Sequence, residues 1–412
     1  MARDRSEWRR PGSLTSSGTA TAPIAHSLAR WATELDPSED DLALARRSLL
    51  DTVGVMFAAR DHPLTPVFGR LPEAGRWAAL AHVLDYDDLH LPSTTHISAV
   101  CIPVALSCGG DERAYLAGAG VMARLGTALG WRHYSAGWHA TCTAGAPAAA
   151  VTAAITRGLD AEATARAIAL AVPAAGGVQR AFGTAAKSLQ VAFAAEAGIR
   201  AAALADAGAS ADPSALAQWM ALVGGDPGAL SRPAAAPAVP GGLAIKPFPC
   251  CYALQRPIAA VALLEPVATD RIRRIGVRTP GASLAPLIHH SPRTGLEGKF
   301  SLEYGVAAAL LEGRPGLHSF SDAAVRRPDA ARLMPTVHVD ATAGGDHLLT
   351  GEIEIEVELD GGAGVRAALA LPPGAPERPM TVDELRSKLE LCGAGDLAEL
   401  SWESAAQFLR SL

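Results

Sequence analysis

The chain has 412 residues, of which 49% are hydrophobic, 19% charged and 5% aromatic. The apolar content is ample for a large core, and the charge density is too low for a disordered chain. A net charge of −6 excludes the concentrated basic surface that nucleic-acid binding requires. Because aromatic residues are few, the core must consist of small aliphatic side chains, which favours close-packed helices.

The amino-terminal segment, residues 1–24, is expected to be a disordered tail. It is rich in Arg, Ser and Thr. Arg9-Arg10 is not followed by the apolar stretch that a twin-arginine signal requires. No run of 18 residues is apolar without a charge, Pro or Gly, so no membrane span is expected. The six cysteines show no CxxC spacing, which predicts reduced thiols in a cytoplasmic protein.

Helical patterns dominate residues 25–262. Ser38 precedes three acids and an apolar stripe with helical spacing, which is the signature of a helix start. Further helices are predicted over about 97–128, 141–157, 161–174 and 187–206, and the Pro- and Gly-rich stretch 226–242 is predicted to be a loop.

The pattern changes to short strands after about residue 263. Strands are predicted over 271–278, 334–339, 352–359 and 365–371, the last two joined as a hairpin through Asp360-Gly361-Gly362. Thr381 and Glu384 form a capping box for a following helix, and 403–412 is predicted to be the last helix. The fold class is therefore mainly α. We predict a large all-helical domain over 25–262, completed by a helix within 400–412, and a smaller α+β lid domain over 263–399.

Neither a cofactor nor a metal site is predicted. Gly118-Ala119-Gly120 lies within a helical pattern rather than after a strand, so it is not a dinucleotide-binding loop. The twelve histidines form no HExxH motif and no zinc-like spacing with cysteine.

The segment from Asp85 to His96 holds three acids and two histidines within twelve residues. Two interpretations fit this composition. The segment is either a solvated loop whose acids cap a helix, or a site in which a carboxylate orients a histidine that exchanges protons with a substrate.

His139 follows Gly137-Trp138 and begins an Ala-rich helix. The positive end of the helix dipole disfavours the imidazolium ion, so this histidine is expected to be neutral and able to act as a base. A capping or packing role fits the same position.

Lysine is scarce, since the chain has 32 Arg and only four Lys. A genome biased toward Arg codons explains the ratio, but Lys187, Lys246 and Lys299 also lie at helix starts or rigid turns. A cation gains nothing from the positive end of a helix. These positions therefore predict an anionic ligand, and without a phosphate-binding loop a carboxylate is favoured.

Six motifs in one order resemble the MmgE/PrpD family, which includes 2-methylcitrate dehydratase, cis-aconitate decarboxylase and iminodisuccinate epimerase. They are LLDTVGV (49–55), the DYDD-to-His96 loop, GWHATCTAG, GTAAKSLQ, KPFPCC and KFSLEY. The resemblance implies a helical domain with an α+β lid, a homodimer, no metal or organic cofactor, and a site between the domains.

The resemblance also implies the site residues. His139 and His96 would transfer protons, Asp85 would orient an imidazole, Lys187 and Lys246 would bind substrate carboxylates, and Tyr304 would donate a further hydrogen bond. The implied partner is a small polycarboxylate rather than a nucleic acid or a membrane.

The sequence departs from the family pattern at four positions. Leu89 stands where many members carry Thr, Gln190 replaces a His, and Cys251 and Gln255 fill positions where His is frequent. These changes indicate a different substrate, or a different reaction, from the best-known members. A dehydratase is the first expectation, and the alternatives are a decarboxylase of the cis-aconitate type, an epimerase of the iminodisuccinate type and an inactive carboxylate-binding homologue.

Overall fold

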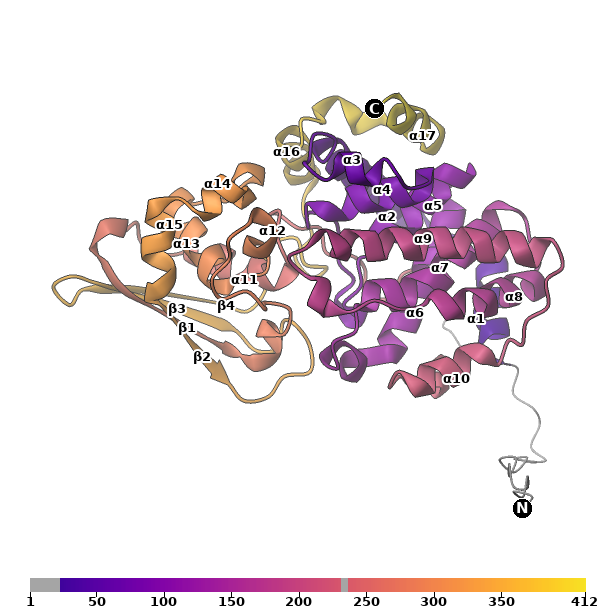
Figure 1. Cartoon of the computed structure of the whole chain (residues 1–412), viewed down its shortest axis with the longest axis horizontal. Coiled ribbons are helices and arrows are strands. Elements are labelled where there is room, and N and C mark those ends of the chain that lie inside the picture. Colours follow the sequence, from indigo (N-terminus) through magenta and orange to yellow (C-terminus); the bar gives the residue numbers. More distant parts are fainter. Residues whose placement is uncertain (1–22, 231–235) are drawn as a thin grey trace, which may run out of the picture.

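The computed structural model describes residues 23–230 and 236–412. Apart from its last two residues, the predicted tail 1–24 lies outside the described residues. Figure 1 shows two parts side by side. One is helical, and the other is smaller and contains a sheet. We call them the helical part and the sheet part.

The helical part is built from α1 to α10, as the helical patterns predict. Its helices are α1 (Ile24–Thr33), α2 (Glu39–Ala58), α3 (Thr65–Phe68), α4 (Glu73–Val83), α5 (Ser98–Cys108), α6 (Glu112–Ser135), α7 (Ala140–Thr156), α8 (Ala161–Ala171), α9 (Ala185–Asp206) and α10 (Ala215–Leu222). The pattern predicted over 97–128 divides into α5 and α6 at Gly109, whose φ of 77° suits glycine. Ser38 caps α2 by accepting a hydrogen bond from the Asp41 amide, as predicted.

Small side chains let α7 and α9 approach closely in the centre of this part. A β-carbon at Gly198 of α9 would lie 2.3 Å from that of Ala149 on α7, far inside van der Waals contact. The Ala-rich composition therefore sets the helix spacing, and with it the position of the residues at the amino-terminal ends of both helices.

The sheet part contains the predicted strands. Its elements are α11 (Tyr252–Val261), β1 (Ile272–Pro280), α12 (Gly295–Gly298), α13 (Leu302–Glu312), α14 (Asp322–Val325), α15 (Pro328–Leu333), β2 (Val337–Thr342), β3 (Ile353–Leu359) and β4 (Gly364–Leu369). The strand order is β2-β1-β3-β4, with β1 parallel to β2 and the other pairs antiparallel. The strand predicted over 334–339 begins later because Met334–Thr336 forms a 3₁₀ turn.

Strand β3 has one buried and one solvated face, as its alternating sequence predicts. Ile353, Ile355 and Val357 are fully buried in the core shared with α11 and α13, whereas Glu354 and Glu356 are exposed. The apolar face of the sheet thus packs on helices that also reach the junction with the helical part.

The carboxyl-terminal helices α16 (Val382–Leu391) and α17 (Trp402–Ser411) return to the helical part (Figure 1). Helix α16 begins with the predicted capping box of Thr381 and Glu384. Ala405, Ala406 and Leu409 of α17 join the helical core, where the helix contacts α2 and α5. Among the described helices, none has the length and apolar character needed to cross a membrane.

Candidate active site

The acidic segment that links α4 to α5, residues 84–97, lies buried at the junction of the two parts. Asp85, Asp87 and Asp88 are at most 2% exposed, so the interpretation of a solvated loop is wrong. Asp85 (φ 50°) and Thr94 (φ 53°) are the two non-glycine residues with left-handed backbone among those the structure describes. Strained conformations of this kind concentrate at functional sites.

Every lysine of the chain is buried, and each donates a hydrogen bond to this segment. Lys187 Nζ donates to Asp85 Oδ1 (2.6 Å), and Lys246 Nζ donates to the Asp85 carbonyl (2.9 Å). Lys299 Nζ donates to the Leu84 carbonyl (2.7 Å), and Lys388 Nζ donates to the Tyr86 carbonyl (2.7 Å). A buried carboxylate is stable only where charge and hydrogen bonds compensate it. The ammonium groups supply that compensation here.

Asp87 holds two imidazoles. Its Oδ2 lies 2.6 Å from His82 Nδ1 and 3.1 Å from His96 Nδ1. Burial raises the pKa of Asp87, but His96, His82 and Lys246 outweigh that effect and keep the pKa well below its usual range. Asp87 therefore has the orienting role expected of Asp85, which instead pairs with Lys187.

The hydrogen-bond partners fix the tautomers of His82 and His96. Lys187 donates to His82 Nε2 over 2.5 Å, so the proton of His82 is on Nδ1 and is donated to Asp87. His96 Nδ1 faces two acceptors, the Asp87 carboxylate and the Asp88 carbonyl at 2.8 Å. Its Nε2 therefore carries the lone pair. Burial lowers the pKa of His96 to about 3, and the ring is neutral.

His139 has the same tautomer through a different partner. Its Nδ1 lies 3.1 Å from Gln190 Oε1, and the Val178 amide donates to that same oxygen, also over 3.1 Å. A backbone N–H can only donate, which fixes the orientation of the Gln190 amide and makes it the acceptor of the His139 Nδ1 proton.

Nε2 of His139 is consequently an unprotonated nitrogen, buried, with no hydrogen-bond partner among the described residues. Burial, followed by the charge of Lys187, holds the pKa of His139 well below its usual value. The neutral state predicted for this residue agrees with that direction.

His96 and His139 open into one small cavity at the junction. It is lined by Asp85, Leu89, Thr94, His96, Tyr134, His139, Thr141, Phe182, Lys187, Cys251, Tyr252, Phe300 and Leu348. Its volume of about 20 Å³ admits a single water molecule. A substrate therefore enters only when the two parts, or a loop between them, move.

Two residues expected in the site lie outside this cavity. Lys246 is behind the acidic segment, where its ammonium group is engaged by Asp85 and Asp87. Tyr304 belongs to α13, and its hydroxyl donates to the Ser319 carbonyl rather than to the cavity. The hydrogen bond to substrate expected from Tyr304 is thus not available in this arrangement.

Sequence reasoning missed His82, which contacts Lys187 and Asp87 next to the cavity, and two residues that line the cavity, Tyr252 and Leu348. His82 is a lone histidine in the last turn of an apolar helix, a pattern typical of a core residue. Tyr252 follows the KPFPCC motif and begins α11, and Leu348 lies in the loop between β2 and β3. Only Tyr252 had a sequence signal, its place next to a motif.

A metal ion does not fit the one cluster of potential ligands found among the described residues. His82, Asp87 and His96 offer atoms within 4.8 Å of one another. Both histidine Nδ1 atoms, however, carry protons donated to the carboxylate, and Lys187 and Lys246 already bring positive charge to the cluster. The donor set is arranged as a hydrogen-bond network.

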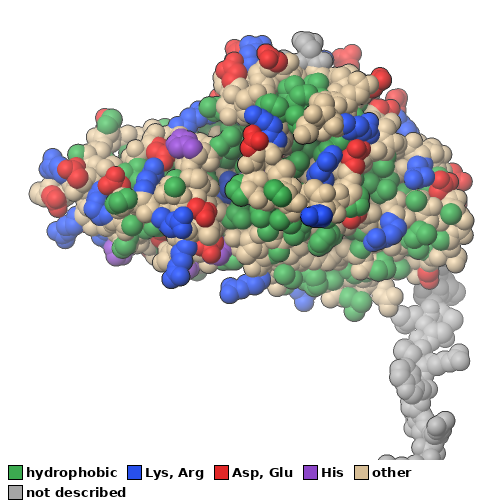
Figure 2. Space-filling view, turned by 45° about the horizontal axis from the view of Figure 1, so that its top comes forward, with side chains coloured by type: hydrophobic (Ala, Val, Ile, Leu, Met, Phe, Trp, Pro, Cys, Tyr) green, Lys and Arg blue, Asp and Glu red, His purple; other side chains and the backbone are tan. Residues whose placement is uncertain are grey.

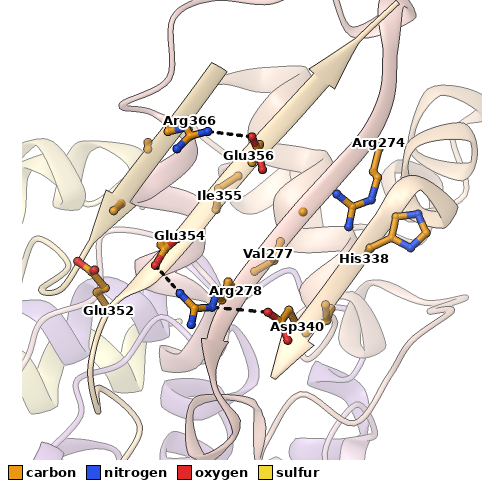
Figure 3. A pocket seen from close by; sticks show the side chains of 14 residues that line it. Arg274, Val277, Arg278, His338, Asp340, Glu352, Glu354, Ile355, Glu356 and Arg366 are labelled. Atoms are coloured by element: carbon orange, nitrogen blue, oxygen red, sulfur yellow. Dashed lines mark hydrogen bonds and ion pairs between the residues drawn. The ribbon is translucent and has the colours of Figure 1, made fainter. Parts of the chain in front are cut away.

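A larger hollow of about 430 Å³ lies on the outer face of the sheet, as Figure 3 shows. Five of its charged side chains pair with one another: Arg278 with Glu354 (3.1 Å) and Asp340 (3.5 Å), and Arg366 with Glu356 (3.2 Å). This face is solvated, whereas the cavity at the junction brings together buried histidines, a carboxylate and a lysine. The cavity at the junction is therefore the candidate site.

Fold and geometry together define a buried candidate site of neutral imidazoles and one ion-paired lysine, built between a helical part and a sheet part. Two family models match the chain, the MmgE/PrpD N-terminal domain over residues 74–223 and the MmgE/PrpD C-terminal domain over residues 248–409. The chain belongs to the MmgE/PrpD family. No curated protein matches it closely enough to be named as a relative. Every residue lining the cavity falls within the two matched ranges.

Proposed function

We propose that the protein is a cofactor-independent lyase that removes a proton beside the carboxylate of a small organic acid and eliminates water. Membership of the MmgE/PrpD family supports a dehydratase or a related activity. The observation that carries the proposal is the pair of unprotonated Nε2 atoms, on His96 and His139, in one cavity with Lys187.

The base in this proposal is His139. A proton beside a carboxylate is weakly acidic, so its removal needs a positioned base that is unprotonated at neutral pH. Nε2 of His139 meets both conditions, because Gln190 holds the other nitrogen and burial keeps the ring neutral.

Lys187 would bind the carboxylate and stabilise the enediolate formed from it. An ammonium group has three N–H donors, and two of them are used by His82 and Asp85. The third is left for a ligand in the cavity, where the low dielectric strengthens the interaction with developing negative charge.

Completing the elimination requires a donor to the departing hydroxyl, and His96 would supply it. For this step His96 Nε2 would first take up a proton from solvent, and the binding of an anion next to the ring favours that protonated form. The proton would pass from Nε2 to the hydroxyl as the carbon–oxygen bond breaks, giving water and a double bond conjugated with the carboxylate. The Tyr252 hydroxyl, which burial keeps protonated, is a further donor at the cavity wall.

An epimerase is the second candidate. It is favoured by the same two imidazoles, since epimerisation needs one group to remove a proton and another to return it on the opposite face of the carbon. A decarboxylase would need only one proton donor, and an inactive homologue would need neither imidazole.

One experiment separates these reactions. The protein is incubated in deuterium oxide with a panel of hydroxy, unsaturated and amino acids that carry one to three carboxylates, and NMR follows each acid. Loss of water supports the dehydratase, exchange with inversion supports the epimerase, and release of carbon dioxide supports the decarboxylase. Absence of all three across the panel would contradict the proposal and favour the inactive homologue.

We also propose that the chain forms a homodimer, on the family resemblance alone. Light scattering coupled to size-exclusion chromatography tests this, and a monomeric mass at micromolar concentration would refute it.

A further inference from the structure

His82 is a buried titratable group that the proposed reaction does not use. It lies in the last turn of α4, its side chain is fully buried, and it is not one of the residues that line the cavity. Its ring is nevertheless close to both cavity imidazoles, with a centroid 4.7 Å from that of His96 and 5.7 Å from that of His139. A fully buried imidazole is costly unless its nitrogens have partners.

Both nitrogens of His82 have charged partners. Nε2 accepts a hydrogen bond from the Lys187 ammonium group over 2.5 Å, and Nδ1 donates to Asp87 Oδ2 over 2.6 Å. Because Asp87 Oδ2 also lies 3.1 Å from His96 Nδ1, the contacts form one chain from Lys187 to His96. The chain joins the group proposed to bind the carboxylate to the group proposed to release the proton.

On the lysine side, His82 directs a charged donor without neutralising it. Of the three N–H groups of Lys187, one donates to Asp85 and one to His82, which leaves the third for the cavity. A second carboxylate in the place of His82 would give the ammonium group two negative partners, and together they would repel an anionic ligand. A neutral acceptor fixes the direction of the third N–H and preserves the attraction for an anion.

On the histidine side, His82 and His96 share one carboxylate. Both Nδ1 atoms face Asp87 Oδ2, while Lys246 Nζ lies 3.5 Å from Asp87 Oδ1. Each N–H donor takes up part of the negative charge of the carboxylate, so the contact with His82 reduces the stabilisation that Asp87 gives to a protonated His96. Without His82, the hydrogen bond from His96 to Asp87 would be stronger.

The charged groups around His82 leave it neutral. Burial and the charge of Lys187 lower the pKa of His82, and its two acidic neighbours, Asp85 and Asp87, only partly oppose these effects. The two other imidazoles beside its ring are themselves neutral. His82 is therefore a neutral imidazole with a fixed tautomer, and its two nitrogens act on different partners.

We propose that His82 is a positioning residue with two separable actions. Through Nε2 it aims the Lys187 ammonium group at the cavity, and through Nδ1 it limits the charge that Asp87 lends to His96. The inference rests on the proposed function, because it concerns how the carboxylate-binding group and the proton donor of that reaction are held.

Two amide variants of different length separate these actions. The Gln side chain reaches the position of Nε2, so His82→Gln keeps an acceptor for Lys187 and loses the donor to Asp87. The Asn side chain reaches only the position of Nδ1, so His82→Asn keeps the donor to Asp87 and loses the acceptor for Lys187. His133→Gln is the matched control, since His133 of α6 is equally buried but bonds to Val223 and Thr143.

The first readout is the affinity for acids, measured by isothermal titration calorimetry with succinate and propane-1,2,3-tricarboxylate as probes. We expect His82→Asn to weaken binding roughly tenfold or more, and His82→Gln and the control to stay within about threefold of the wild type. Three results would overturn the action on Lys187: equal losses in the Asn and Gln variants, no loss in His82→Asn, or no binding of either acid to the wild type.

The second readout is the resonance of the His96 Nδ1 proton in NMR spectra at neutral pH. A stronger hydrogen bond to a carboxylate moves such a proton downfield. We expect a downfield move in His82→Gln, where Asp87 has lost one donor, and none in His82→Asn or in the control. An unmoved proton in His82→Gln, or the same move in both His82 variants, would overturn the action on His96. A merely structural role would lower stability without this division between the variants.

The wild type decides the question if the variants do not fold. Its ¹⁵N-histidine resonances should show His82 with a protonated Nδ1 and an unprotonated Nε2, and the opposite tautomer would overturn both actions.

None of these readouts needs turnover, so the two proposals can fail separately. The expected division between the variants, without turnover of any acid in the NMR panel, would refute the lyase and leave the role of His82 standing. Turnover of an acid together with identical behaviour of the two His82 variants would do the reverse.

Discussion

Replacing Gln190 by Glu tests whether the tautomer of His139 is set by its neighbour. The carboxylate would keep both acceptor contacts, to the Val178 amide and to His139 Nδ1, while adding a negative charge about 3.1 Å from the ring. Two unit charges 4 Å apart at an effective dielectric of 20 interact by roughly 4 kcal/mol. Because Gln190 is partly exposed, we expect less than this limit, a rise of the His139 pKa by about 1–3 pH units.

The assay is a pH titration of ¹⁵N-histidine resonances, which distinguish a protonated Nδ1 from a protonated Nε2. In the wild type, His139 should carry its proton on Nδ1 and remain neutral down to low pH. In Gln190→Glu the imidazolium should form at higher pH, and the acid limb of the pH profile of kcat/KM should move upward with it. Gln190→Met, which removes the acceptor and keeps the volume, should give a mixture of tautomers.

Two results would refute this reasoning. One is a wild-type His139 with its proton on Nε2. The other is a glutamate variant whose His139 titrates as in the wild type. Either would mean that Gln190 packs beside the ring without controlling its proton, and the base proposed for the reaction would lose its support.

Four further predictions concern single substitutions. His139→Asn should keep the fold and lower turnover at least roughly a hundredfold in steady-state kinetics, and near-normal turnover would remove this residue from the reaction. Lys187→Met should lower the free energy of unfolding by about 3–5 kcal/mol in urea denaturation, since it leaves Asp85 buried without its partner; adding Asp85→Asn should recover part of the loss. Gly198→Ala should destabilise the chain by roughly 1–3 kcal/mol, because the added β-carbon would lie 2.3 Å from one on α7, and an unchanged melting temperature would contradict the packing. The pKa of His90 is lowered by burial from 6.5 to about 4, so the unfolded state binds a proton first and stability should fall as pH drops through that interval, by roughly 3 kcal/mol in all; His90→Gln should remove that part of the pH dependence.

Most of the secondary structure could be predicted because its signals are local. Ser38 caps α2 through the spacing of an acid three residues later, and the alternation in β3 places Ile353 and Ile355 on the buried face. Propensity and periodicity act within a few residues, so sequence alone reveals them. Boundaries that depend on packing, such as the late start of β2, were placed less well.

The sequence predicted which residues lie at the candidate site better than it predicted which residues they contact. The segment from Asp85 to His96, together with His139 and Lys187, does meet in one cavity. The prediction that Asp85 orients an imidazole was wrong. Asp85 has a left-handed backbone conformation that the sequence does not reveal. Tyr304 shares a motif with Lys299, yet its hydroxyl bonds to Ser319, a contact between segments fifteen residues apart.

The lysines show where reasoning from local chemistry stops. Lys187 and Lys246 at unfavourable helix positions predicted an anion, and anions are present, but they are the protein's own Asp85 and Asp87. Sequence identifies a cation that needs a partner. It does not show whether that partner is a ligand or a segment a hundred residues away.

The burial of all four lysines also affects how the protein will behave toward amine chemistry. The described surface presents no ε-amine, because all four lysines are buried, and the basic side chains scattered over the face seen in Figure 2 are therefore arginines. Acylating reagents and amine-directed cross-linkers should therefore find no lysine to react with on the folded chain. Each ε-amine becomes reactive only when the segment between Leu84 and Asp88 separates from it. The rate of lysine acylation, read residue by residue in a mass spectrometer, would thus measure how often the candidate site opens.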